Sequence, residues 1–304
     1  MLFLFVLCHV LFSCTKEKTN YNKELEPGDI SNQEVKVAYK LNIGDYEVSI
    51  KTRSGKLHLG YNKIYIELTN RFTGERAPLD AFQFSAVMNH SSGQKAAAPY
   101  RFDLGEQVEE GPYAGYVVFP DQSSADVAWT LYMQISIYDQ TYALEQEVQV
   151  EAQENKNLNM TTFIGEDDDV YCVALIAPQQ PIVGENELIT GIYRYTSFSN
   201  ISTEYNPGEV EYAFLEAKGY TLKLDPRMPD PSMGNHSSPN NKDLAQRDDG
   251  LYYGQVNYTM TGNWTLNFIL LNGQGQVVKG EDVPTDFTPG VEGVKSTLHL
   301  DILF

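Results

Sequence analysis

The sequence predicts an all-β protein: two tandem immunoglobulin-like β-sandwich domains that follow a signal peptide and a flexible tether. Three observations predict this fold. Short runs alternate apolar and polar residues, no stretch of ten or more residues shows a helical period, and one set of motifs occurs twice in the same order. The clearest alternating run begins at Trp129 and ends at Ile137, with its odd-numbered positions apolar. Such a run is typical of a half-buried strand.

The first element is an apolar run over residues 1–13, MLFLFVLCHVLFS. It is shorter than the roughly 20 residues that a membrane-spanning helix needs, so we interpret it as a signal peptide. Its end, Leu11-Phe12-Ser13-Cys14, resembles the lipobox of bacterial lipoproteins, in which the cysteine is acylated. The resemblance implies that Cys14 carries lipid. An uncleaved anchor and a plain secretory signal are the alternatives.

Residues 14–34 are polar and have almost no apolar side chain to bury. Such a segment cannot offset the entropy lost on ordering, so we expect a flexible tether. The whole chain has a formal net charge of −19. This charge disfavours nucleic acid as a partner, because nucleic-acid binding requires a basic surface.

The rest of the chain consists of two copies of one pattern, which we assign to domain 1 (residues 35–156) and domain 2 (residues 157–304). The matching segments keep their order in both copies: Tyr46–Ile50 with Tyr171–Leu175, Gly60–Ile64 with Gly184–Leu188, Gly111–Val117 with Gly250–Val256, and Trp129–Met133 with Trp264–Phe268. Both tryptophans begin alternating strands, so we expect them to fill the two cores. Asn272-Gly273 predicts a two-residue hairpin of the type I′ class.

Cysteine usage leaves one thiol in the folded part. Cys8 lies in the signal peptide and Cys14 is the expected lipid site, so only Cys172 remains. It stands in the strand-like run Val170–Ile176. We therefore expect a buried, unreactive thiol.

A loop in the second copy contains the residues that most suggest chemistry. Met228, Met233 and His236 fall within nine residues of a segment rich in Pro, Gly and Asn. Two thioethers and an imidazole form a soft ligand set that suits copper. The alternative is that the methionines fill gaps in the packing and the histidine caps a turn. A weaker second metal site is suggested by Met88 and His90 in the first copy.

An enzyme is not indicated. Beyond the signal peptide the histidines are His58, His90, His236 and His299, and none lies in a nucleophile-elbow, HExxH or CxxC context. We expect no catalytic residues. The acidic run Glu166–Asp169 lacks the ligand spacing of a calcium loop, so we interpret it as a solvated turn.

The motifs of copy two resemble those of the YtkA-like (FixH-like) domain family. They are Gly184-x-Asn186 before a strand, the loop with Met233 and His236, and Thr261-Gly-Asn-Trp264 leading into the last tryptophan strand. Copy one is a poorer match before Trp129. The resemblance implies small periplasmic or lipid-anchored β-sandwich domains that occur in copper-handling or cytochrome-oxidase-assembly settings.

Two functions follow from these observations. The first is a copper-binding lipoprotein in the cell envelope of a Gram-negative bacterium, on the periplasmic side or the cell surface. It would sequester copper or pass it to a copper-transport or cell-envelope protein. The alternative is a non-catalytic structural or interaction module that binds a protein or a glycan. The sequence leaves open whether Cu(I) or Cu(II) is bound and which membrane holds the anchor.

Overall fold

The computed structural model of the chain describes residues 35–102, 112–138, 140–153, 155–197 and 209–304. These residues form β-strands joined by turns and loops and contain no helix, so the all-β prediction is confirmed. None of them belongs to a helix with the length and hydropathy needed to cross a bilayer. The predicted signal peptide, Cys14 and the tether lie outside the described residues.

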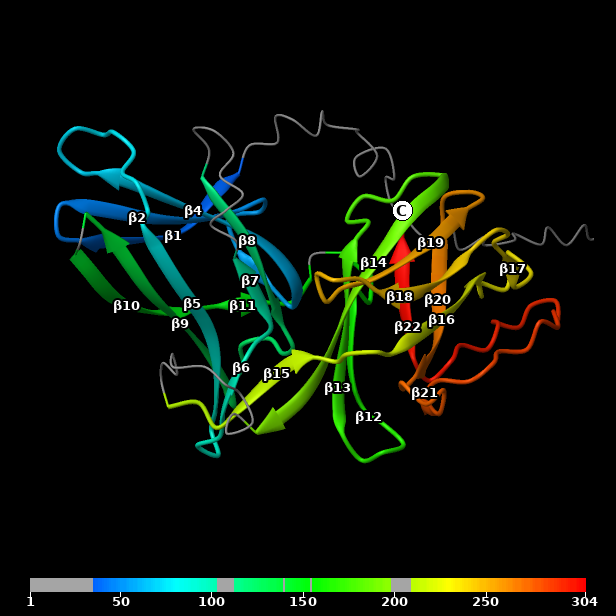
Figure 1. Ribbon diagram of the computed structural model, residues 1–304. Helices are drawn as coiled ribbons and strands as arrows, with labels where there is room; N and C mark the ends of the chain where they lie inside the picture. Colours follow the sequence, from blue (N-terminus) through cyan, green and yellow to red (C-terminus); the bar gives the residue numbers. More distant parts are fainter. Residues whose placement is uncertain (1–34, 103–111, 139, 154, 198–208) are drawn as a thin grey trace, which may run out of the picture.

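The first half of the chain has two facing sheets, seen on the left of Figure 1. One sheet has the order β1 (Lys36–Ile43), β2 (Tyr46–Thr52), β4 (Gly60–Asn70), β8 (Tyr113–Phe119), β7 (Tyr100–Phe102). The other begins with β10 (Gln140–Val148), β9 (Val127–Ile137), β5 (Ala81–His90), β6 (Lys95–Ala97). A short parallel pair joins β3 (Leu57–His58) to β11 (Val150–Glu151).

The second half repeats this arrangement, with the strand order β12 (Met160–Ile164), β13 (Val170–Ala177), β14 (Gly184–Ser197), β19 (Tyr252–Tyr258), β18 (Lys242–Gln246) on one side. The facing strands are β22 (His299–Leu303), β20 (Asn263–Leu271) and β16 (Thr221–Met228), with the short β21 (Val277–Lys279) and β17 (His236–Ser237) at their edges. Here β18 pairs with both β19 and β16, so the two sides are joined into one sheet.

Strand registers support the correspondence found in the sequence. In the first half Ile64 on β4 pairs with Gly115 on β8. In the second half Leu188 on β14 pairs with Gly254 on β19. The sequence comparison aligns Ile64 with Leu188 and Gly115 with Gly254, so equivalent residues have equivalent partners.

Each half has its own apolar core between its two strand layers. Strand β9 shows why the layers form: its odd-numbered side chains from Val127 to Ile137 are buried and the intervening ones are not. Burial of the apolar face drives the two layers together. Trp129 is buried in the first core and Trp264 in the second, as the sequence predicts.

A third buried cluster lies where the halves meet. It joins Val118 on β8 to Cys172 on β13 and Tyr193 on β14. Strand β15 (Tyr212–Glu216) pairs with β14 and also, in parallel, with β6 of the first half. Figure 1 shows this strand between the two halves, beside β6 and β14. Whether each half is an independent immunoglobulin-like domain stays a prediction.

Two local predictions have clear outcomes. Cys172 is fully buried and its burial raises the pKa of the thiol to about 12, which fits an unreactive thiol. The prediction of a two-residue hairpin at Asn272-Gly273 is wrong. The side-chain oxygen of Asn272 accepts hydrogen bonds from the backbone N–H groups of Gln274 and Gln276, and Gly275 takes the left-handed conformation with φ of 78°. The Asn272 side chain therefore stabilises a longer loop.

Candidate functional site

The loop between β16 and β17 brings the predicted metal ligands to one end of the second half. Met228 ends β16 and His236 begins β17, and the two residues lie directly opposite each other in an antiparallel pair. Opposite residues in such a pair project to the same face, with Cβ atoms about 4.5–5.5 Å apart. The side chain of Met228 is buried and that of His236 is exposed.

A turn between β19 and β20 receives both side chains. The Nε2 atom of His236 lies 3.1 Å from the hydroxyl oxygen of Thr259. A Cβ atom added to Gly262 would lie only 2.5 Å from the terminal methyl of Met228. The imidazole and the thioether end of Met228 therefore converge on residues 259–262.

The third predicted ligand lies in the loop that joins the other two. Met233 is partly buried and packs against the same core cluster that contains Met228. Its backbone N–H donates to the carbonyl oxygen of Asp230 at 2.8 Å, which closes a tight turn. Both methionines therefore pack against the core of the second half.

The tryptophan of the second core forms the floor beside this loop. The rings of His236 and Trp264 meet edge to face with centroids 6.2 Å apart. The indole N–H of Trp264 donates to the carbonyl oxygen of Met260 at 3.0 Å, which holds the turn in place. The loop therefore packs beside the buried ring of Trp264.

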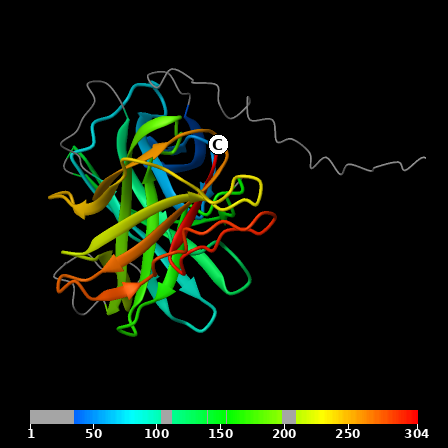
Figure 2. The ribbon, with the colours of Figure 1, turned by 90° about the vertical axis from the view of Figure 1, so that its right-hand side faces the viewer.

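A long segment between β21 and β22, residues 280–298, covers the loop from the outside. The side-chain amide of Asn235 donates to the carbonyl oxygen of Pro284 at 3.0 Å. The backbone N–H of Gly293 donates to the carbonyl oxygen of Pro229 at 2.7 Å. Figures 1 and 2 show the two loops side by side at one end of the second half.

The weaker site in the first half is only partly equivalent. Met88 lies opposite Trp129 on the neighbouring strand. In the second half, Arg227 lies opposite Thr265, so the next residue, Met228, comes beside Trp264. The histidines differ, because His90 lies on the same strand as Met88. The Nδ1 atom of His90 accepts a hydrogen bond from the backbone N–H of Ser92 at 3.1 Å, so its lone pair is engaged.

The carboxylate groups near the Met/His loop also accept hydrogen bonds within the protein. Both carboxylate oxygens of Asp225 accept hydrogen bonds from the guanidinium Nε of Arg227, at 3.0 and 3.1 Å. A carboxylate oxygen of Asp230 accepts from the N–H and the hydroxyl of Ser232. Within the described residues, no group of three or more His, Cys, Asp and Glu side chains could hold a metal. Any metal here would depend on the thioethers.

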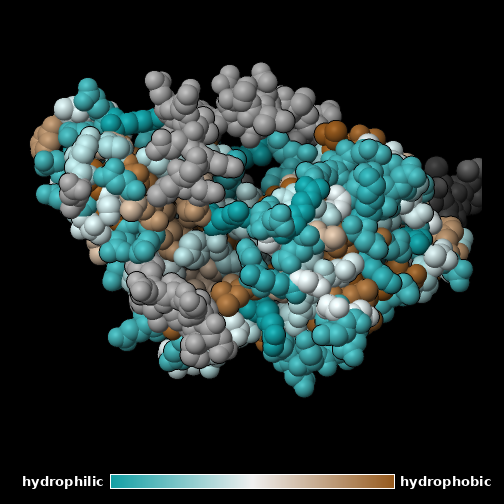
Figure 3. Space-filling view, viewed as in Figure 1, coloured by the Kyte–Doolittle hydropathy of each residue, from teal (hydrophilic) through white to brown (hydrophobic). Residues whose placement is uncertain are grey.

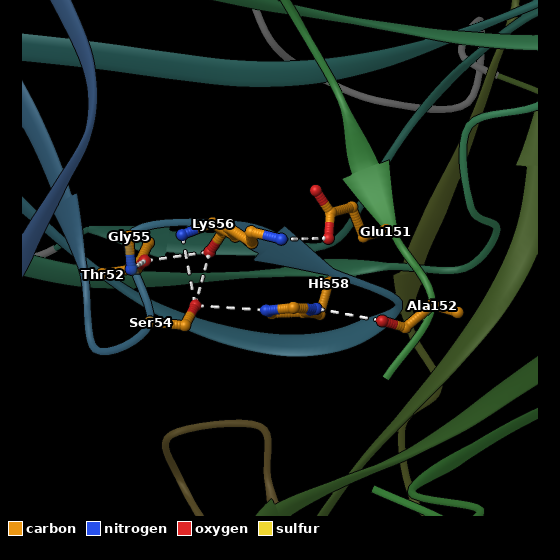
Figure 4. Close-up of polar contacts among 7 residues, drawn as sticks. All are labelled: Thr52, Ser54, Gly55, Lys56, His58, Glu151 and Ala152. Carbon is orange, nitrogen blue, oxygen red and sulfur yellow. Dashed lines mark hydrogen bonds and ion pairs between the residues drawn. The ribbon is translucent and has the colours of Figure 1, made fainter. Parts of the chain in front are cut away.

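Sequence analysis missed a serine–histidine pair in the first half, drawn in Figure 4. The Nδ1 atom of His58 lies 3.0 Å from the carbonyl oxygen of Ala152, so this nitrogen carries the proton. The hydroxyl of Ser54 lies 3.1 Å from Nε2 and 3.2 Å from the carbonyl oxygen of Lys56, so its single proton has two acceptors. No local motif reveals this arrangement, because Ala152 is 94 residues from His58 in the chain.

The contacts from Ser54 to His58 and from His58 to Ala152 resemble those that activate a catalytic serine. The neighbouring backbone N–H groups, however, already donate to other acceptors. The backbone N–H of Gly55 donates to Thr52, and that of Lys56 donates to the Ser54 oxygen itself. An oxyanion would need such N–H groups to be available. We therefore interpret the pair as a contact that holds the turn after β2 against the chain after β11, where Lys56 and Glu151 form an ion pair at 2.8 Å.

A polar hollow of about 420 Å³ lies over β14, β18 and β19. The guanidinium of Arg247 stacks on the ring of Tyr253 at 3.8 Å from its centroid and forms an ion pair with Glu187 at 3.3 Å. These contacts engage Arg247 and Glu187 within the protein.

The similarity found between this chain and known proteins is one of structure. No family profile matches it, and no curated protein is similar to it. Among solved structures, a DUF4785 family protein from Legionella pneumophila is similar at 10% identity with a TM-score of 0.24, over 78% of this chain and 56% of that one. A conserved domain protein from Bacillus anthracis is similar at 12% identity with a TM-score of 0.29, over 88% of this chain and 89% of that one. Likenesses at this level say nothing about function, and the resemblance to YtkA-like domains remains a prediction.

Proposed function

We propose that this protein binds copper through Met228, Met233 and His236 and sequesters the ion or delivers it to a partner, without catalysing a reaction. We further propose that Cys14 anchors it by lipid to a membrane of the Gram-negative cell envelope. The partner would be a copper-transport or cell-envelope protein. The strongly acidic chain, with a formal net charge of −19, is compatible with attraction of cations.

One observation carries the copper proposal. Met228 and His236 face each other across β16 and β17, and both side chains reach the turn at residues 259–262. The sulfur and the imidazole come from two paired strands, so little conformational entropy is lost when a metal binds between them. Met233 approaches from the connecting loop and packs on the same core.

The donor set favours Cu(I). Two thioethers and one neutral imidazole are soft or borderline, uncharged ligands, whereas Zn(II) and Ca(II) prefer sites with anionic or oxygen donors. Asp225 is held by Arg227 and Asp230 by Ser232, so neither carboxylate is poised to complete a Cu(II) site. This supports the lower oxidation state.

Competition against a Cu(I) chelator tests the proposal. Wild type and Met233→Leu are titrated as purified full chains. Leucine keeps the volume of methionine, so the free energy of unfolding is expected to change by less than about 1.5 kcal/mol while copper affinity falls sharply. Met133→Leu is the matched control, because Met133 is buried in the first core, away from the loop. Equal competition by wild type and Met233→Leu would remove the loop as the copper site.

The alternative is an interaction module for a protein or glycan partner. It is favoured by three exposed apolar side chains on the segment that covers the Met/His loop: Phe287 (46% exposed), Val291 (56%) and Val294 (58%). Figure 3 shows a mainly hydrophilic surface on the second half, interrupted by apolar atoms toward this end. If Phe287→Ser abolishes capture of a partner and Met233→Leu does not, the interaction module is preferred.

A further inference from the structure

Thr259 makes a contact that distinguishes the two nitrogens of His236. Its hydroxyl oxygen lies 3.1 Å from Nε2. In the described part of the chain, nothing is hydrogen-bonded to Nδ1 of His236. The two ring nitrogens of His236 therefore have different surroundings.

A histidine that ligates a metal through one nitrogen carries its proton on the other. That N–H is almost always donated to a fixed acceptor, which sets both the tautomer and the orientation of the ring. A threonine hydroxyl can serve as this acceptor because it has two lone pairs. The contact with Thr259 meets this requirement if the metal is bound at Nδ1.

We propose that Thr259 is the positioning residue of the Met/His site: its hydroxyl oxygen accepts a hydrogen bond from the Nε2–H group of His236 and leaves Nδ1 to ligate Cu(I). The inference rests on the proposed copper function. Thr259 does not touch the metal and acts through the imidazole alone.

The surroundings of Thr259 hold it in place for this role. The preceding residue, Tyr258, is buried, and its ring packs on Trp264 and Phe304 with centroids 5.5 and 5.0 Å apart. The same turn contains Gly262, which contacts the methyl of Met228. A shift of this turn would therefore change its contacts with both the imidazole and the thioether, and the buried Tyr258 opposes such a shift.

The test compares full-length wild type, Thr259→Val and Thr259→Ser. Valine keeps the shape of threonine and removes the acceptor, whereas serine keeps the hydroxyl. Nitrogen-15 NMR of His236 reads the tautomer directly, with and without Cu(I), and chelator competition measures affinity. Thr259 is exposed, so thermal melts of the three proteins are expected to agree.

The expected result has three parts. Copper-loaded wild type carries its proton on Nε2, Thr259→Val binds Cu(I) about 10- to 100-fold more weakly, and Thr259→Ser restores most of the affinity. In the metal-free protein, Thr259→Val also shifts the tautomer balance away from Nε2–H, a readout that does not depend on copper.

Two failures are distinguishable. If wild type does not compete for Cu(I), the proposed function is wrong and this inference falls with it. If wild type binds copper but Thr259→Val binds equally well, or if the loaded protein carries its proton on Nδ1, only the role of Thr259 is wrong.

Discussion

Asn62 and Asn186 make the same three hydrogen bonds at the starts of β4 and β14. Each side-chain amide donates to the carbonyl oxygens two and four residues earlier, and each side-chain oxygen accepts from the backbone N–H four residues earlier. Both side chains are buried. The duplicated Gly-x-Asn motif is therefore a structural motif that fixes the chain as it enters an equivalent strand in each half.

Replacing either asparagine with alanine should destabilise the protein. The substitution leaves buried backbone groups without partners, at a cost of about 1–3 kcal/mol for each unpaired group. Urea denaturation of Asn62→Ala and Asn186→Ala measures the loss. Asn42→Ala, at an exposed position on β1, is the control and should change stability little. Wild-type stability in both buried variants would show that the motif has no structural role.

Separate expression tests whether the halves are domains. Each half has its own core, so we predict that residues 35–155 and 160–304 each fold and give a cooperative melt. Each should melt below the full chain, because separation exposes the third cluster and removes the pairing of β15 with β6. If neither piece folds, the protein is a single cooperative unit.

High pH should unfold the protein. Burial raises the pKa of Tyr61 to about 12 from 10.0, that of Cys172 to about 12 from 9.0, and that of Tyr193 well above 10.0. Each group stays neutral in the folded chain while the unfolded chain ionises, so its contribution to stability is complete below the unfolded pKa. Above that pH the free energy of unfolding falls by up to about 1.4 kcal/mol per pH unit for each group.

Denaturation curves between pH 8 and 12 check this expectation, with tyrosinate absorbance followed in parallel. We expect ionisation of the buried tyrosines to coincide with unfolding. Tyrosine ionisation that is complete near pH 10 in a chain that remains folded would contradict the burial of these groups.

Cys14 lies outside the described residues, and its lipidation is tested by fractionation. Cys14→Ala removes the acylated thiol, so the protein should move from the membrane fraction to the soluble fraction. Cys172→Ala is the control, because that thiol is buried in the folded part and should not affect localisation. An unchanged distribution of Cys14→Ala would mean that the anchor assignment is wrong.

Sequence patterns predict most of the fold because they reflect short-range rules. Alternation from Trp129 to Ile137 gives a strand with one buried face, and the repeated motifs give equivalent registers in both halves. The hairpin at Asn272 was mispredicted because the Asn272 side-chain oxygen accepts hydrogen bonds from the backbone N–H groups of Gln274 and Gln276 and so stabilises a longer loop.

Contacts between distant segments could not be predicted. The pairing of β15 with β6, the hydrogen bond from His58 to Ala152 and the contact of His236 with Thr259 all join residues far apart in the chain. The composition of the Met/His loop indicates its ligand types. It does not show that Met228 faces His236 or that Arg227 engages Asp225, because both depend on strand register and side-chain conformation.

X-ray absorption at the copper edge of the full chain, loaded with one equivalent of Cu(I), tests the copper site most directly. The account predicts a spectrum with sulfur scatterers from Met228 and Met233 and an imidazole contribution from His236, and loss of one sulfur in Met233→Leu. A spectrum with only nitrogen and oxygen neighbours, or failure to form a one-to-one complex, would contradict it.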